Sequence, residues 1–251
     1  MGRSRPNSKL WIGISATYLC GVASQVACLP CRAESTTLRL RHTSTHMSPT
    51  PPSLLLLDFD GVLAQSARPR RMAALAAAAG CSPQRVHEVV FAQGLERAYD
   101  AGQIDTQTYL AQLSEELGHP IDRATWIAAR VAACRADPSA VAQVLAVSAT
   151  KAVAVLTNNG PLMVDAIEQI VPSLFPLLQD RVLCSGALGG RKPEVQVYRR
   201  ALAQLGQRAE HTLFVDDLFV NVRGARTAGL HADTVRDARA LRRVLKRYGL
   251  A

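Results

Sequence analysis

Several side chains of types that bind phosphate or metal ions follow the apolar runs of this chain. Carboxylate oxygens suit small divalent cations, and an ammonium group, a hydroxyl group and main-chain N–H groups suit phosphate. Each signal has a plainer interpretation, because aspartate often caps helices, Thr-Asn-Asn-Gly is ordinary turn sequence and a lone Lys-Pro is usually on the surface. Together they favour a phosphate and metal site. The residues are Asp58, Asp60, Thr157, Asn158, Lys192, Asp216 and Asp217.

Four short apolar runs predict the strands that would position these groups. In a parallel sheet, ligands bind at the carboxyl ends of the strands, where each of these runs meets polar residues. Helical patterns separate the runs, with Pro161 and Pro193 suited to first turns and Gly206 suited to a helix end. The alternation predicts an α/β fold with a Rossmann-like parallel sheet and helices on both faces. The runs are Leu54–Leu57, Ala152–Leu156, Val182–Leu183 and Leu213–Val215.

The interval 68–149 contains only helical patterns. We expect it to form an all-α cap inserted into an α/β core made of residues 53–67 and 150–251. Ser82, Asp105, Asp122 and Asp137 are suitable N-terminal caps for its helices. The expected helices are 72–79, 83–93, 106–117, 123–134 and 138–147.

The first 46 residues differ from the rest. Residues 10–30 carry no charge and follow three basic residues, as in a signal peptide or a marginal membrane span. Met47 stands shortly before the first predicted strand, so residues 1–46 are interpreted as an N-terminal extension, unstructured or from a mis-assigned start. An export or anchoring signal is the alternative.

Net charge and cysteine content limit which binding partners and which cellular location are expected. The formal net charge of +9 is partly due to the first 46 residues, which hold six of the 29 basic residues and one of the 20 acidic ones. The basic residues from Arg236 to Arg247 are interpreted as the solvated face of a last helix, so no nucleic-acid partner is expected. The six cysteines are scattered. Cys28-Leu-Pro-Cys31 has no second metal-binding pair, and a cytoplasmic location is expected, or an exported or anchored one if residues 1–30 act as a signal.

Four segments resemble the motifs of the haloacid dehalogenase superfamily, and the likeness covers nearly all of 53–248. The helical insertion resembles a C1-type cap. The segment from Arg97 to Asp105 is similar to the branch containing α-glucose-1-phosphatase and the N-terminal phosphatase domain of epoxide hydrolase. The four segments are Asp58-Phe-Asp-Gly-Val-Leu, Thr157-Asn-Asn, Arg191-Lys-Pro-Glu and Phe214-Val-Asp-Asp-Leu-Phe-Val-Asn.

This resemblance implies a hydrolase that transfers a phosphoryl group to Asp58 and then to water. A carboxylate is already ionised at neutral pH and serves as the nucleophile. Asp60 would protonate the leaving alcohol and then activate the water. Lys192, the Thr157 hydroxyl and the Asn158 N–H would hold the phosphate.

The resemblance also implies Mg²⁺, bound by Asp58, Asp216 and the main-chain oxygen of Asp60. Asp217 and Asn221 would hold waters or orient the ligands. Asn221 stands where many relatives have a further aspartate, so one formal charge is missing. Cap residues Arg68, Arg97, Tyr99 and Gln103 are candidate substrate contacts, with surface or packing roles as the alternative.

The expected function is a Mg²⁺-dependent phosphatase for a small sugar or organic phosphate, working as a monomer or homodimer without a membrane partner unless residues 10–30 are an anchor. A β-phosphoglucomutase-like phosphotransferase and a catalytically silent regulatory protein are the alternatives. Dehalogenation is disfavoured because dehalogenases of this superfamily lack the second aspartate, which is present here as Asp60.

Overall fold

The computed structural model describes residues 51–251, which contain a five-stranded parallel sheet. Its order, β5-β4-β1-β6-β7, places the first strand in the middle. All four predicted strands are present, so the predicted fold class is confirmed. The strands are β1 (Leu54–Leu57), β4 (Ala152–Thr157), β5 (Val182–Cys184), β6 (Thr212–Asp216) and β7 (His231–Thr234).

Alternate residues of β1 belong to two different hydrophobic cores. Leu55 and Leu57 pack into one core, and Leu54 and Leu56 into the other. This follows from the strand geometry, in which successive side chains point to opposite faces. All four leucines are fully buried, which explains the continuous apolar run.

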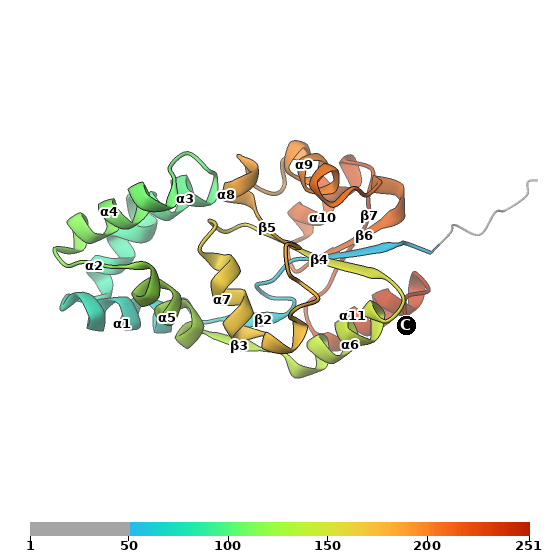
Figure 1. Ribbon diagram of the computed structural model, residues 1–251, viewed down its shortest axis with the longest axis horizontal. Coiled ribbons are helices and arrows are strands. Elements are labelled where there is room, and N and C mark those ends of the chain that lie inside the picture. Colours follow the sequence, from blue (N-terminus) through green and yellow to red (C-terminus); the bar gives the residue numbers. More distant parts are fainter. Residues whose placement is uncertain (1–50) are drawn as a thin grey trace, which may run out of the picture. The chain divides into compact units, whose positions relative to one another are not determined.

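Helices cover both faces of the sheet (Figure 1). Helices α9 (Val195–Leu205) and α10 (Phe219–Thr227) cover the face of Leu54. The other face is covered by α6 (Pro138–Ser148), α7 (Met163–Ile170) and α11 (Ala238–Arg247). Shorter elements in the connections are η2 (Pro172–Leu174), α8 (Ser185–Leu188) and η3 (Ala209–His211).

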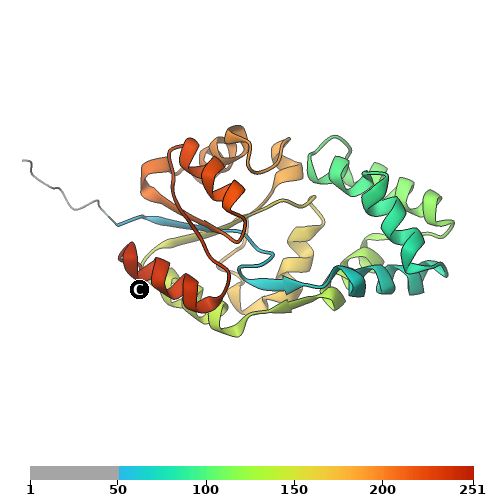
Figure 2. The same ribbon diagram turned by 180° about the vertical axis from the view of Figure 1, so that it is seen from behind.

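A helical region lies beyond the carboxyl ends of the strands in both views (Figures 1 and 2). A small antiparallel sheet connects it to the core, formed by β2 (Ala64–Ser66) and β3 (Cys134–Ala136). This pairing was not predicted. The helical elements are α1 (Arg68–Ala79), α2 (Pro83–His87), η1 (Glu88–Ala92), α3 (Leu95–Asp100), α4 (Thr106–Leu117) and α5 (Arg123–Ala133).

The predicted helix caps are confirmed. Ser82, Asp105, Asp122 and Asp137 each accept a hydrogen bond from a first-turn N–H group. α6, which we expected inside the insertion, packs against β4 and α11 of the core. The domain boundaries stay a prediction.

A buried ion pair lies at the centre of the helical region. The Arg71 and Glu96 side chains are paired through both guanidinium Nη atoms, with 2.8 Å between Nη2 and Oε2. Tyr109 donates to the same carboxylate, and the Arg71 guanidinium lies 5.1 Å from the centre of the Trp126 ring. Burial alone would raise the pKa of Glu96, but Arg71 outweighs it and lowers that pKa. Glu96 is therefore ionised and paired.

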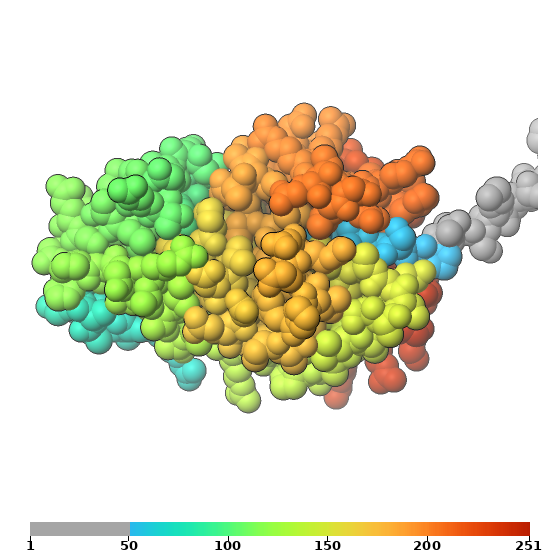
Figure 3. Space-filling view, in the orientation of Figure 1, coloured from blue at the N-terminus to red at the C-terminus, as the bar shows by residue number. Residues whose placement is uncertain are grey.

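Close backbone contacts join the helical region to the core. The Asp100 carboxylate accepts from the Gly160 N–H at 2.9 Å, and Ser185 Oγ donates to the Asp100 carbonyl at 2.7 Å. A Cβ on Gly160 would come within 2.1 Å of the Tyr99 ring, so only glycine fits this approach. Figure 3 shows the green helices in contact with the orange part of the core on this face.

No helix within residues 51–251 has the length and apolar character needed to cross a membrane. α11 buries Leu241, Val244 and Leu245 and exposes its basic side chains, so the predicted solvated face is confirmed. Residues 1–46 and the Cys28–Cys31 segment lie outside the described residues.

Breaking the buried pair should destabilise the protein. Glu96→Gln leaves the Arg71 charge buried without a compensating carboxylate, which costs about 3–5 kcal/mol in free energy of unfolding. Urea denaturation followed by circular dichroism measures this. The control Glu116→Gln breaks an exposed pair with Arg85 and should leave stability nearly unchanged. Equal losses in the two variants would contradict the expected cost.

Asp100 should make stability depend on pH. Burial raises the pKa of Asp100 to about 8, and nearby Glu96 adds to the effect. The unfolded chain releases this proton near pH ~4, so the folded state binds more protons between these values and unfolding becomes easier as pH rises. The free energy of unfolding of Asp100→Asn, compared with that of the native protein, should therefore increase as pH rises from about 5 to about 8. Parallel pH profiles from urea denaturation would contradict this.

Candidate active site

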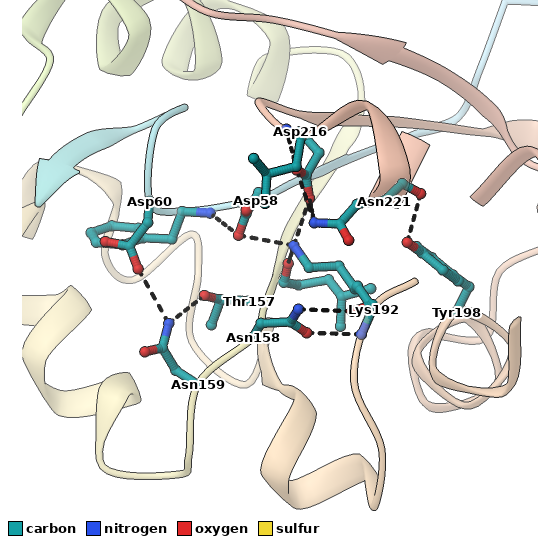
Figure 4. Close-up of polar contacts among 12 residues, drawn as sticks. Asp58, Asp60, Thr157, Asn158, Asn159, Lys192, Tyr198, Asp216 and Asn221 are labelled. Atoms are coloured by element: carbon teal, nitrogen blue, oxygen red, sulfur yellow. Dashed lines mark hydrogen bonds and ion pairs between the residues drawn. The ribbon is translucent and has the colours of Figure 1, made fainter. Parts of the chain in front are cut away.

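The Lys192 ammonium group lies at the centre of the polar residues (Figure 4). Its Nζ is 3.0 Å from Asp58 Oδ1 and 2.8 Å from Asp216 Oδ2, and it donates to the Leu156 carbonyl at 2.8 Å. The Lys192 side chain has no exposed surface. Burial alone would lower the pKa of Lys192, but Asp58 and Asp216 outweigh it and raise that pKa. Lys192 therefore carries a positive charge between the two aspartates.

The order of the strands explains why these groups meet. β1 pairs in parallel with β4 on one side and β6 on the other, in matching register. Asp58 directly follows β1, and Asp216 is the last residue of β6. The two carboxylates therefore reach the same edge of the sheet, as the sequence predicted.

Asn158 fixes the loop that carries Lys192. The Asn158 side chain accepts from the Lys192 main-chain N–H at 2.8 Å and donates to its carbonyl at 3.0 Å. Lys192 lies in the loop before α9 rather than in the helix. This double hydrogen bond holds the backbone on both sides of the lysine side chain.

Asp216 is held by several donors. The Asn221 amide donates to Oδ1 at 3.1 Å and Oδ2 at 3.0 Å, and the Leu218 N–H donates to Oδ1 at 2.8 Å. Tyr198 donates to the Asn221 carbonyl at 2.7 Å. These contacts fix the fully buried Asp216 in one orientation.

Three carboxylates form a cluster that fits a divalent cation. Asp58, Asp216 and Asp217 each place an oxygen within 4.8 Å of the others. Burial, opposed in part by Lys192, raises the pKa of Asp58 to about 8. One ammonium group therefore does not balance the buried negative charge, and a cation would favour the ionised form. An oxygen-only set of ligands suits Mg²⁺.

Gly61 leaves the space that Asp217 occupies. Its φ is +80°, and a Cβ there would lie 2.4 Å from Asp217 Oδ2. A larger residue would displace this carboxylate from the cluster. Gly61, three residues before the start of β2, therefore makes room for the carboxylate cluster directly.

Asp60 is bound by the helical region. The Arg130 Nη2 atom of α5 donates to Asp60 Oδ2 at 2.6 Å and to Asn159 Oδ1 at 3.2 Å. Asn159 in turn donates to Asp60 Oδ2 at 3.3 Å and to Thr157 Oγ1 at 2.7 Å. The second oxygen of Asp60, Oδ1, is buried and has no partner among residues 51–251.

A cavity of about 650 Å³ lies between the core and the helical region. Asp58, Asp60, Asp217 and Asn158 line its core side. Arg68 and Arg97 line it from the helical region, as the sequence analysis considered. Tyr99 is instead buried and hydrogen-bonded to Thr106, and Gln103 is exposed outside the cavity lining.

The structure thus brings the sequence-derived residues together, while their catalytic and binding roles stay predictions. Asp217, expected only to support the ligands, contributes a carboxylate to the cluster, whereas the carboxylate of Asp60 lies apart from it. Arg130 and Asn159 were missed. The available signal was an arginine on the buried face of α5, four residues after Trp126.

Known proteins resemble this chain in sequence and fold. The model of the haloacid dehalogenase-like hydrolases matches residues 52–229. Phosphatase MT3486 of Mycobacterium tuberculosis is 39% identical over 80 residues, which are 32% of this chain and 36% of that protein. The match therefore spans about a third of that relative's length.

Two solved structures share the fold. One is a HAD family enzyme of Bacteroides thetaiotaomicron in complex with magnesium and inorganic phosphate, with 19% identity, 73% of this chain and 93% of that chain covered, and a TM-score of 0.60. The other is L-2-haloacid dehalogenase of Xanthobacter autotrophicus, with 23% identity, 80% and 84% covered, and a TM-score of 0.53. Since the family model covers most of the described residues, this chain belongs to the haloacid dehalogenase-like hydrolase family.

Proposed function

We propose that this hydrolase is a Mg²⁺-dependent phosphatase that acts on small phosphomonoesters through a phosphorylated Asp58. One observation carries the proposal: Asp58 and the unpartnered Oδ1 of Asp60 both belong to residues lining one cavity beside a carboxylate cluster. The cavity size suits a small molecule. The partial match to a named phosphatase supports the same chemistry.

Each step can be assigned to a residue of this chain. A carboxylate oxygen of Asp58 attacks phosphorus, and the bond from phosphorus to the ester oxygen breaks. Asp60 gives its proton to that leaving oxygen. Asp60 then takes a proton from water, whose oxygen attacks phosphorus and breaks the bond to Asp58, releasing inorganic phosphate.

The surrounding groups would position the phosphate. Lys192 holds Asp58 in place and offers positive charge, and the Thr157 hydroxyl and the Asn158 N–H would contact phosphoryl oxygens. Asp58, Asp216 and the main-chain oxygen of Asp60 would hold Mg²⁺, with Asp217 and Asn221 beside them. When bound, Mg²⁺ would offset the charge of the phosphoryl oxygens.

Arg130 and Asn159 would keep Asp60 directed at the site from the helical region. We propose that α1–α5 act as a cap of the C1 type that excludes bulk water. A cavity between such a cap and the sheet favours a small leaving group over a phosphoprotein. The proposed subclass is therefore that of small-molecule phosphatases.

Replacing the nucleophile tests the proposal. With Mg²⁺, the native protein should release inorganic phosphate from p-nitrophenyl phosphate and from members of a sugar-phosphate panel. Asp58→Asn should lower turnover by about 10⁴-fold or more while circular dichroism stays unchanged. The control Asp165→Asn alters a surface pair with Arg123 and should retain activity. Full activity of Asp58→Asn would remove this residue as nucleophile, and sugar-phosphate isomerisation without phosphate release would favour a phosphotransferase.

The metal site can be tested without turnover. Isothermal titration calorimetry should detect Mg²⁺ binding to the native protein, weakened at least about 10-fold in Asp216→Asn. Asp165→Asn should bind as the native protein does. EDTA should abolish phosphate release, and added Mg²⁺ should restore it. Unchanged Mg²⁺ affinity in Asp216→Asn would contradict the assigned ligands.

A further inference from the structure

Five arginines line the cavity, and two of them lack a carboxylate partner. Arg71 is paired with Glu96, Arg130 with Asp60 and Arg191 with Asp100. Arg68 and Arg97 form no ion pair within residues 51–251, and both belong to the helical region. The side of the cavity opposite the acidic cluster is therefore rich in positive charge.

Two of the cavity-lining arginines also have a buried donor without a partner. The Nε atoms of Arg71 and Arg191 are buried and make no hydrogen bond within the described chain, and both residues line the cavity. Arg71 is only 2% exposed. A buried donor left unsatisfied costs about 1–3 kcal/mol, a cost that an acceptor brought by a ligand would offset.

The acidic residues nearby do not cancel this charge. Glu96 is already engaged by both Nη atoms of Arg71. Asp100 lies 3.8 Å from Arg191, and burial raises the pKa of Asp100 to about 8, so its negative charge is engaged by Arg191 and reduced at neutral pH. The carboxylates of Asp58, Asp216 and Asp217 form the separate cluster on the core side of the cavity.

The position of Arg68 suits an anion. It is the first residue of α1, so the positive end of the helix dipole lies beside it, and the N-cap residue Ala67 makes no side-chain hydrogen bond there. Its guanidinium lies 4.3 Å from the centre of the Phe91 ring, a contact that restricts the side chain and leaves its N–H edges available.

We propose that the substrate carries, in addition to its phosphate ester, a second anionic group that binds Arg68 and Arg97. This inference rests on the proposed phosphatase activity and narrows it. The second group is an oxyanion, either a carboxylate or another phosphate, since both accept paired hydrogen bonds from guanidinium. The cavity volume of about 650 Å³ suits a small phosphorylated acid or a small bisphosphate.

The test uses non-hydrolysable phosphonates as competitive inhibitors of p-nitrophenyl phosphate hydrolysis in saturating Mg²⁺. 3-Phosphonopropionate and 4-phosphonobutyrate are compared with propylphosphonate and butylphosphonate, and the matching bisphosphonates form a third arm. In the native protein at least one anionic arm should inhibit about 10- to 100-fold more strongly than the uncharged analogue, as expected for charge-assisted hydrogen bonds. If the carboxylate-bearing phosphonates show the larger increase in inhibition, the second group is a carboxylate; if the bisphosphonates do, it is a phosphate.

The variants locate the second anion site. Arg68→Gln and Arg97→Gln should each lose about 10-fold of that gain and leave inhibition by the alkylphosphonates unchanged. Arg70→Gln is the control, because Arg70 is an exposed neighbour on α1 outside the cavity lining. Equal inhibition by charged and uncharged analogues in the native protein, or a gain that survives in both variants, would overturn the inference.

Failure of the proposed function gives a different result. Absence of phosphate release by the native protein would contradict the phosphatase activity alone. Calorimetric titration of the Mg²⁺-loaded native protein with the same phosphonates would then decide whether Arg68 and Arg97 bind a second anion.

Discussion

A single buried ammonium group holds the acidic side of this cavity together. Two carboxylates as close to it as those of Asp58 and Asp216 would repel each other strongly without an intervening positive charge. Desolvating the charges is costly, and the hydrogen bonds from Lys192, Asn221 and the Leu218 N–H offset that cost. These groups come from the residue after β1, from β6 and from the loop before α9, so the ammonium group meets both carboxylates only when these three segments are folded together.

The central sheet was predictable because its strands are buried on both faces. Leu54–Leu57 has no polar residue and is too short for a helix, so a strand buried on both faces was the favoured assignment. The meeting of Asp58 and Asp216 followed from the rule that parallel strands present their carboxyl ends at one edge. β7 was missed because His-Ala-Asp-Thr forms an edge strand with three half-exposed residues and lacks an apolar run. β2 and β3 are only three residues each.

The environment of Asp60 could not be deduced in the same way. Its partner Arg130 is 70 residues away in sequence and belongs to the helical region, whose packing onto the core no local pattern specifies. Asn159 was visible within the Thr-Asn-Asn motif, but a turn-forming role explained it equally well. Local patterns therefore indicated which residues lie at the edge of the sheet, and tertiary packing decided which of them touch.

The link between Arg130 and Asp60 also bears on how the molecule can move. α5 carries the guanidinium and the loop after β1 carries the carboxylate, so a hinge motion that lifts the helices from the sheet separates the two charges. Asp60 would keep only the Asn159 amide as a partner. Opening of the helical region away from the sheet would therefore change the hydrogen bonding of Asp60 inside the cavity. The same motion would let solvent enter, so the two changes would occur together.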